Sequence, residues 1–341
     1  MRFILLLLLS STLHAQSFTF ISPQKPGSGT SQWTDIIARE LQNHLDVDVR
    51  YYPGARALPA PNDFQENLRF DNSQAIVTNG GNGISYVLEE TAKYKYSDWD
   101  SVGMMNLNII VSKRKDSDKI VFASRAGRTP DAMGIALLLC GPNKSVEQYT
   151  TCFKDNVTWV KGMSQGEIRL AFRRGELTVD RENPAAYKKH VESNPDMEVW
   201  FHHGILQPDG SHADDPNHLG FLLEDLYTKK WGVKPEGRFY NSYKLIKSYR
   251  DSIQKAIWVN KDNPYRDELI LALKKMINDP KSKEAIEKKV GKYDWVIGDD
   301  GNDQIETLKR FVTKDALVDL VKFSKEALGM NSTYKIHLLK E

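Results

Sequence analysis

Along most of the 341-residue chain, short apolar runs alternate with longer stretches in which apolar residues recur at helical spacing. The predicted strands are 17–21, 47–51, 74–78, 102–112, 119–123, 157–160, 177–179, 198–201 and 256–260. The predicted helices that separate most of them are 33–45, 62–70, 131–139, 165–173, 184–192 and 219–230. Strands that alternate with helices usually form parallel sheets covered by helices. The sequence therefore predicts an α/β fold.

The last part of the chain differs, because it contains predicted helices and no further strand. These helices are 266–278, 282–290, 303–311 and 315–328. Since they have no sheet of their own, we expect them to pack on the N-terminal sheet. The prediction is a chain of two lobes: 16–110 begins the first lobe, 111–252 forms the second, and 253–341 returns to the first lobe with the C-terminal helices.

Residues 1–15 have the layout of a secretory signal peptide, with Arg2, an apolar run over 3–9, and small and polar residues that end at Ala15. The apolar run is too short to span a bilayer, which needs about 20 residues. We therefore expect export. An oxidising compartment permits a disulfide between Cys140 and Cys152, which lie 12 positions apart; two unrelated buried thiols are the alternative.

Four segments rich in Gly, Ser, Asn or Arg follow predicted strands, and all except 78–83 precede a predicted helix. They are 26–31 (PGSGTS), 78–83 (TNGGNG), 123–130 (ASRAGRTP) and 179–184 (VDRENP). At such positions helix N-termini direct backbone N–H groups into a crevice, where they bind anions. Arg125 and Arg128 add guanidinium groups, which can bind a carboxylate in a bidentate manner. Together the four loops predict a ligand cleft between the two lobes.

Charge balance and motif content argue against several other classes of protein. The 47 basic and 45 acidic residues leave a formal net charge of +2 and are scattered, so no nucleic-acid partner is expected. Neither the dinucleotide-binding glycine fingerprint nor the P-loop motif occurs, so no nucleotide site is supported. Two cysteines are too few for a four-thiolate metal site.

Several segments resemble the solute-binding receptors of the tripartite tricarboxylate transporters, a family of bacterial periplasmic proteins. PGSGTSQWTDIIARELQ is similar to the family's first loop and helix, and YYPGARA to its Asn-Arg-Pro-Gly-Ala-Gly segment. KYSDWDSVGMMNLNIIVSK resembles the lobe crossover, WVKGMSQGEIRLAFRRGELTVDRENPAA a strand–helix–turn unit, and DELILALKKMINDPKSKEAIEKKVG the C-terminal helix pair. The departures from the family pattern are Tyr51-Tyr52, Arg125, Arg128 and the His- and Asp-rich segment 202–218.

The resemblance implies a two-lobed α/β fold of the type II periplasmic-binding-protein class, which closes like a Venus flytrap on a small organic carboxylate. It also implies a monomeric periplasmic receptor with no catalytic activity, metal or cofactor, which delivers its ligand to integral membrane transporter subunits. The implied ligand contacts are backbone N–H groups and side chains of Ser28, Gly29, Thr30, Ser31, Thr78, Asn79, Gly80, Ser124, Arg125, Gly127, Thr129, Lys161 and Asp180. Arg125, Arg128 and Arg181 indicate an anion with more than one carboxylate.

An alternative function is a secreted α/β serine hydrolase. Residues 162–166 fit the GxSxG pattern, follow a predicted strand and precede a predicted helix, as a nucleophile elbow must. Ser164 would then be the nucleophile, with Asp209 and one of His203, His212 and His218 completing a triad.

A second alternative is a metal site, since imidazole and carboxylate groups recur between residues 202 and 218 at spacings that can ligate zinc. The candidate ligands are His202, His203, His212, Asp214, Asp215 and His218. The same segment is also rich in Gly and Pro, so a solvated surface loop is the favoured interpretation.

Overall fold

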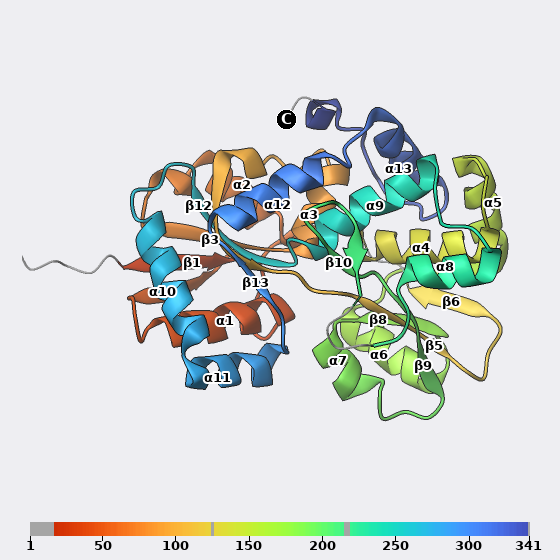
Figure 1. Ribbon diagram of the computed structural model, residues 1–341, viewed down its shortest axis with the longest axis horizontal. Coiled ribbons are helices and arrows are strands. Elements are labelled where there is room, and N and C mark those ends of the chain that lie inside the picture. Colours follow the sequence, from red (N-terminus) through yellow and green to blue (C-terminus); the bar gives the residue numbers. More distant parts are fainter. Residues whose placement is uncertain (1–16, 124–125, 215–218, 340–341) are drawn as a thin grey trace, which may run out of the picture.

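The computed structural model describes residues 17–123, 126–214 and 219–339. Within these ranges the chain forms two separate β-sheets, each covered by helices, with further helices lying between them (Figure 1). The two-lobed α/β architecture expected from the sequence is thus confirmed. The predicted signal peptide, Ser124, Arg125, Asp215 and His218 lie outside the described residues.

In the described residues the first lobe contains a six-stranded sheet. Its strands, in spatial order, are β13 (Trp295–Ile297), β4 (Trp99–Met105), β12 (Lys255–Asn260), β3 (Gln74–Asn79), β1 (Phe18–Ser22) and β2 (Val47–Tyr51). Strand β1 pairs in parallel with β2 and β3, whereas β12 and β13 run antiparallel to their neighbours. The sheet therefore combines strands from both ends of the chain.

The second lobe contains a five-stranded sheet, again counting described residues. Its strands, in spatial order, are β7 (Val157–Val160), β6 (Ile120–Ala123), β8 (Val179–Glu182), β5 (Ile110–Arg114) and β9 (Met197–His202). A short hairpin, β10 (Ile205–Leu206) with β11 (His212–Ala213), follows. Strand β5 is antiparallel to both neighbours. The expected parallel sheets are thus mixed sheets, because β5 and β12 enter directly from the other lobe.

The sequence predicted one strand over 102–112, and the structure has two strands there, one in each sheet. Residues 106–109 connect them and form the first crossover. The second crossover is 252–254, which leads from α9 into β12. The crossovers are joined because Leu107 N–H donates to the Asp251 carbonyl (3.1 Å), and the Gln304 side-chain amide binds Asn106 Oδ1 (2.7 Å) and the Ser252 carbonyl (2.5 Å).

Thirteen α-helices lie in the described residues. They are α1 (Gly29–Leu41), α2 (Pro59–Glu66), α3 (Gly80–Leu88), α4 (Thr129–Cys140), α5 (Val146–Asn156), α6 (Gln165–Arg174), α7 (Pro184–His190), α8 (Leu223–Trp231), α9 (Arg238–Asp251), α10 (Arg266–Asn278), α11 (Pro280–Val290), α12 (Asp299–Lys309) and α13 (Lys314–Glu326). None of them is both long and apolar enough to cross a membrane.

Helices α3, α9, α4 and α13 form a layer that links the lobes, and a continuous apolar core runs through it (Figure 1). Helix α3 approaches α9 so closely that a Cβ on Gly83 would lie 1.9 Å from the Tyr249 carbonyl oxygen, and one on Gly80 would lie 2.4 Å from the Arg250 carbonyl oxygen. These glycines are therefore needed for helix packing. Two of the three glycines of TNGGNG face α9.

The C-terminal helices divide between the two lobes. Helices α10 and α12 pack on β4, and α11 packs on α1, as expected for elements that cover the first sheet. Helix α13 instead packs on α9 and α5, away from that sheet. The expectation that all the C-terminal helices lie on the N-terminal sheet is therefore wrong for α13, whose apolar face finds its partner in the inter-lobe layer.

The segment 328–339, which we call the C-terminal segment, returns from α13 to the first lobe. At its start the Thr129 hydroxyl of α4 donates to the Met330 sulfur (3.3 Å). Further on, Thr333 N–H donates to the Leu88 carbonyl (2.8 Å), and the buried Lys335 ammonium donates to the carbonyls of Tyr86 and Ala92, each at 2.9 Å. The chain thus passes between the lobes a third time.

Cys140, at the end of α4, forms a disulfide with Cys152 in α5, with their Cα atoms 6.1 Å apart. The predicted bridge is confirmed. The disulfide restricts the unfolded chain by closing a loop. Changing both cysteines to serine should therefore lower the free energy of unfolding by about 3 kcal/mol. Urea denaturation without reductant measures this loss, and adding reductant to the wild type is the control. Equal stability of the two proteins would contradict it.

Candidate functional site

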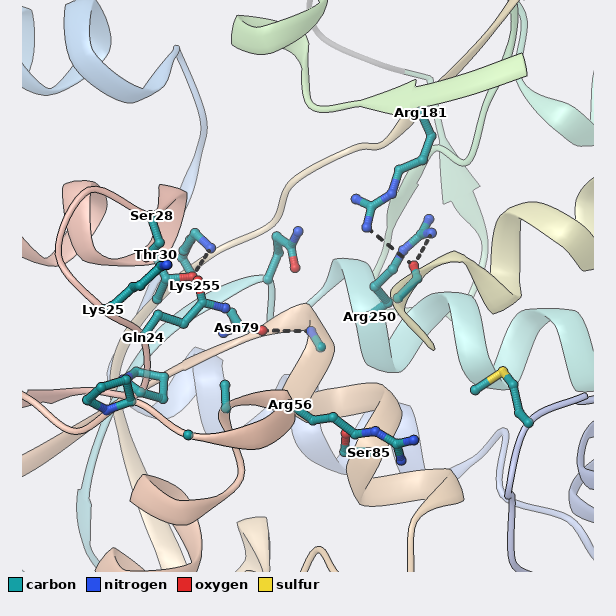
Figure 2. A pocket seen from close by; sticks show the side chains of 18 of the residues that line it. Gln24, Lys25, Ser28, Thr30, Arg56, Asn79, Ser85, Arg181, Arg250 and Lys255 are labelled. Atoms are coloured by element: carbon teal, nitrogen blue, oxygen red, sulfur yellow. Dashed lines mark hydrogen bonds between the residues drawn. The ribbon is translucent and has the colours of Figure 1, made fainter. Parts of the chain in front are cut away.

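A cavity of about 930 Å³ lies between the two lobes. The first lobe contributes residues from 23–30, 53–57, 79–85 and 254–255, and the second contributes Gly127, Lys161 and Arg181. Arg250 of α9 and residues 328–331 of the C-terminal segment complete the described part of the wall (Figure 2). Loops that follow strands of both sheets therefore converge on one hollow.

The first turn of α1 forms one part of the wall. The Ser28 hydroxyl caps this helix by accepting from Ser31 N–H (3.1 Å), and Ser28 and Thr30 both line the cavity. Capping satisfies the N–H of Ser31, and the earlier N–H groups of the turn have no partner within the helix. A helix start of this kind favours a negative charge beside it.

Asn79 is the last residue of β3 and caps the start of α3. Its Oδ1 accepts from Gly81 N–H (2.8 Å), while its own N–H donates to Asn82 Oδ1 (3.0 Å), so the two asparagines form a reciprocal cap. The side chain is 6% exposed and lines the cavity, and its Nδ2 has no hydrogen-bond partner among the described residues. The cap therefore leaves one buried amide donor for a ligand.

Lys255 begins β12, directly opposite Asn79 in the antiparallel pair. Its ammonium donates to Thr30 Oγ1 (3.0 Å), and no described carboxylate lies within salt-bridge distance (Figure 2). Burial lowers the pKa of Lys255 to about 7, and the positive charge of Arg181 acts in the same direction. The lysine thus lacks a negative partner among the described residues.

The second lobe presents Arg181, which extends from β8 into the cavity (Figure 2). Its Nε is 3.6 Å from Asp131 Oδ2, too long for a hydrogen bond. Burial, with the charges of Arg128 and Arg250, lowers the pKa of Arg181 to about 10, although Asp131 acts in the opposite direction. The guanidinium stays charged near neutral pH.

A buried ionic network supports this wall. Asp131, in the first turn of α4, accepts hydrogen bonds from Arg250 Nη1 (2.6 Å) and His203 Nε2 (2.8 Å). Arg250 also pairs with Asp251, 2.6 Å from its Nε. Burial alone would raise the pKa of Asp131, but the charge of Arg250 and the bond from His203 outweigh it and hold that pKa well below its usual range. The network joins α9 to the second lobe.

The charged side chains that line the described part of the cavity are all of one sign. Among the described lining residues six are basic and none is acidic: Lys25, Arg56, Lys161, Arg181, Arg250 and Lys255. Arg56 pairs with Glu89 (2.7 Å), and Arg250 with Asp131 and Asp251, whereas the three lysines have no salt bridge to a described carboxylate. Such a hollow attracts small anions and repels cations.

The structure brings together some of the residues expected from the sequence and not others. Ser28, Thr30, Asn79, Gly127 and Lys161 line the cavity. The remaining described candidates are absent from its wall: Gly29, Ser31, Thr78, Gly80, Thr129 and Asp180. Ser124 and Arg125 lie outside the described residues.

Other partners occupy several of these remaining side chains. Thr78 Oγ1 accepts from the Trp258 indole N–H (2.8 Å), and Ser31 Oγ bonds to the Ser28 carbonyl (3.0 Å). Asp180 is buried against Arg128, 2.6 Å from its Nη2. The sequence indicated that Arg128 contacts an anionic ligand. Its fully buried position against Asp180 does not fit that role.

Sequence reasoning missed Lys25, Arg56, Arg250 and Lys255. Lys25 lies one residue before the first predicted loop, and Lys255 one residue before a predicted strand. The signal that could have identified Lys255 is a basic residue directly before a predicted strand. Arg250 had no such signal, since no helix is predicted over the residues of α9.

No family model and no curated protein matches the sequence. Solved structures do match it: a TctC solute-binding protein from Polaromonas has 12% identity and a TM-score of 0.54, over 90% of this chain and 99% of that one. MatC from Rhodopseudomonas palustris with bound malate has 12% identity and a TM-score of 0.55, over 88% and 98%. An R. palustris protein with adipate has 11% identity and a TM-score of 0.52, over 91% and 97%. This chain has the fold of the TctC-type solute-binding proteins.

Within the TctC-type fold, the GxSxG serine is a helix cap. Ser164 Oγ accepts from Glu167 N–H (3.4 Å) and Ser164 N–H donates to Glu167 Oε2 (2.6 Å), which together form a capping box at the start of α6. None of the described histidines is hydrogen-bonded to Ser164. The structure therefore gives the hydrolase alternative no support.

Changing Ser164 to alanine should lower the free energy of unfolding by about 1 kcal/mol, because the helix loses its cap. The variant should bind organic acids as the wild type does, since Ser164 does not line the cavity. Urea denaturation and ligand titration measure the two effects. Stoichiometric labelling of Ser164 by a serine-directed phosphonate would instead favour the hydrolase.

The described histidines of this chain do not gather into a metal site. His203 bonds through Nδ1 to the Tyr243 hydroxyl (2.7 Å) and through Nε2 to Asp131, and burial lowers its pKa. His202 Nε2 lies 2.9 Å from Asp214, and His212 Nδ1 lies 3.4 Å from Glu224. In the part of the chain that the structure describes, no three potential ligands come together.

Proposed function

We propose that this chain is a periplasmic receptor of the tripartite tricarboxylate transporter family, which captures a small organic carboxylate and delivers it to membrane transporter subunits. The observation that carries the proposal is the cavity between the lobes, whose described wall has six basic side chains and no acidic one. The TctC-type fold supports it, because two proteins of that fold hold malate and adipate.

The charge distribution favours a ligand with two acidic groups. Lys255 and the start of α1 lie on the first lobe, and Arg181 and Lys161 on the second. An anion that contacts both sides stabilises the arrangement in which the lobes are close, because it gains contacts there that an open cleft lacks. Closure by rotation about the crossovers 106–109 and 252–254 fits this role, and it makes or breaks no covalent bond.

Two features support export to the periplasm. Residues 1–15 have the composition of a signal peptide. The Cys140–Cys152 bridge persists most readily in an oxidising compartment.

Thermal unfolding in the presence of a panel of acids tests the binding function. Malate, adipate, citrate and monocarboxylates are compared with their neutral amides at equal concentration. An acid present at 100 times its dissociation constant stabilises the native state by about 2.7 kcal/mol, and the amide of the same acid should give no shift. If no carboxylate raises the midpoint, or if amides act equally, the proposed function is wrong.

Delivery to a transporter needs a separate measurement. A strain that lacks this chain should lose uptake of the labelled acid selected by the panel, and restoring the chain should restore uptake. Unchanged uptake in the deletion strain would contradict the transport role while leaving the binding role intact.

A further inference from the structure

Three hydrogen-bond donors converge on one corner of the cavity. They are the Lys255 ammonium at the start of β12, the Thr30 hydroxyl in the first turn of α1, and the Asn79 amide at the end of β3 (Figure 2). Lys255 and Asn79 are directly opposed in register, and Lys255 Nζ lies 3.0 Å from Thr30 Oγ1. We call these three residues the lysine corner.

Existing hydrogen bonds fix the direction of each donor. Asn79 Oδ1 is occupied by Gly81 N–H, which turns the unpartnered Nδ2 away from the helix that it caps. Thr30 Oγ1 accepts from Lys255, so its own hydrogen is left to be donated elsewhere. Asn79 is 6% exposed and Thr30 is 3% exposed, so water alone satisfies these donors poorly.

The described groups that face Lys255 are polar, positively charged or, in the case of Met105, apolar, and none of them is acidic. They are Thr30 from α1, Asn79 from β3, Met105 as its register partner on β4, Gln254 beside it, Arg250 at the end of α9 and Arg181 from β8. Arg250 is neutralised by Asp131 and Asp251. No described carboxylate reaches Lys255, so its charge has no counterion in the described part of the chain.

We propose that the lysine corner is an anion subsite in which Lys255 gains a proton as the acidic group of the ligand enters, so that capture of each anion takes up one proton. This inference rests on the proposed function and concerns the same cavity. Lys255 differs from Lys25 and Lys161, the other two lysines of the described wall, because it is less exposed than they are, and the ligand supplies the negative charge that it lacks.

The direction of the pH effect follows from the environment of Lys255. In the empty cleft burial lowers the pKa of Lys255 to about 7. A bound carboxylate raises that pKa, because it favours the ammonium form. The affinity for the anion is therefore greatest at pH values below the pKa of Lys255 in the ligand-free chain, and it falls as the pH rises above that pKa. Between pH 6.5 and pH 8.5 the dissociation constant of a fully ionised acid should rise about 20-fold.

Calorimetric titration of the full chain with malate tests this linkage. Titrations at pH 8 in two buffers with different ionisation enthalpies give the number of protons taken up. The wild type should take up close to one proton per malate at pH 8 and far less at pH 6. The Lys255→Met variant should bind more weakly, take up no proton and lose the pH dependence of its dissociation constant.

Lys25→Met is the matched control, since Lys25 lines the same cavity but is exposed. It should lower affinity through lost charge and keep the proton uptake of the wild type. Proton uptake that persists in Lys255→Met, or its absence from the wild type at pH 8, would overturn the proposal.

A direct titration separates this inference from the proposed function. In the empty chain labelled with ¹³C-lysine, one Cε resonance should titrate near neutral pH and be missing from Lys255→Met. If that resonance titrates near 10 or above, the lysine corner does not take up a proton, whatever the ligand. If the resonance titrates near neutral pH and neither malate nor any other carboxylate binds, the proposed function is wrong, and sulfate is then used to test the lysine corner. Sulfate should raise the pH midpoint of the Lys255 resonance. An unchanged midpoint overturns the proposal.

Discussion

Changing Asp131 to asparagine should lower the free energy of unfolding by about 3–5 kcal/mol. Asp131 is fully buried and accepts hydrogen bonds from Arg250 and His203, with Arg181 close by. The amide keeps the shape of the side chain and removes the charge that compensates the two arginines. Urea denaturation at pH 7 measures the loss, and a loss below 1 kcal/mol would contradict the importance of the network.

The pH dependence of this loss has a definite sign. The pKa of Asp131 in the folded chain lies below its usual value, so its stabilising contribution is complete above the unfolded pKa of about 4 and declines below it. The difference between wild type and variant should therefore shrink in acid. Asp116→Asn is the matched control, since Asp116 pairs with Arg114 at an exposed position, where solvent screens the pair, and it should cost much less stability than Asp131→Asn.

Changing Arg181 to methionine should raise the dissociation constant for a bound dicarboxylate at least about 30-fold, which corresponds to the loss of about 2 kcal/mol of binding free energy. Arg181 is a charged donor from the second lobe, and its Nε has no hydrogen-bond partner among the described residues. Without it, an anion held by the first lobe loses one of the two basic side chains, Arg181 and Lys161, that the second lobe presents. Calorimetric titration with malate measures the change.

The control for Arg181 is Arg174→Met, because Arg174 pairs with the neighbouring Glu176 at the exposed end of α6 and does not line the cavity. The dissociation constant of the Arg174→Met variant for malate should match that of the wild type. If Arg181→Met remains folded and binds malate as tightly as the control, the second lobe does not contact the ligand through this residue.

Much of the fold followed from periodicity, and the exceptions have physical causes. The sequence predicted no helix over α9, since its inner residues include Lys247, Arg250 and Asp251, whose charges break the apolar pattern. Burial of these groups depends on partners such as Asp131, which is distant in sequence. Local pattern cannot show such pairing.

Helix α3 was missed for a different reason. Its first residues, Gly80 and Gly83, are typical of a loop, and the sequence predicted a ligand loop there. The glycines are instead required because the backbone of α9 lies against them. Only the tertiary contact reveals that a glycine-rich segment is helical here.

The candidate site was predicted in outline. Loop positions after strands indicated Ser28, Thr30 and Asn79, because anion-binding helix starts depend on local sequence. The basic residues Lys255 and Arg250 come from segments more than 150 residues away along the chain. Their convergence depends on the second crossover, which sequence pattern does not specify.

The third passage of the chain between the lobes has a mechanical consequence. The paired crossovers 106–109 and 252–254 lie together and define one pivot, whereas the C-terminal segment is anchored on α4 at Met330 and on α3 at Lys335. Because the C-terminal segment is attached at both ends, the two lobes can separate only until this segment is fully extended. The cleft should therefore open through a small angle, and releasing Lys335 from its carbonyl anchors should widen that angle.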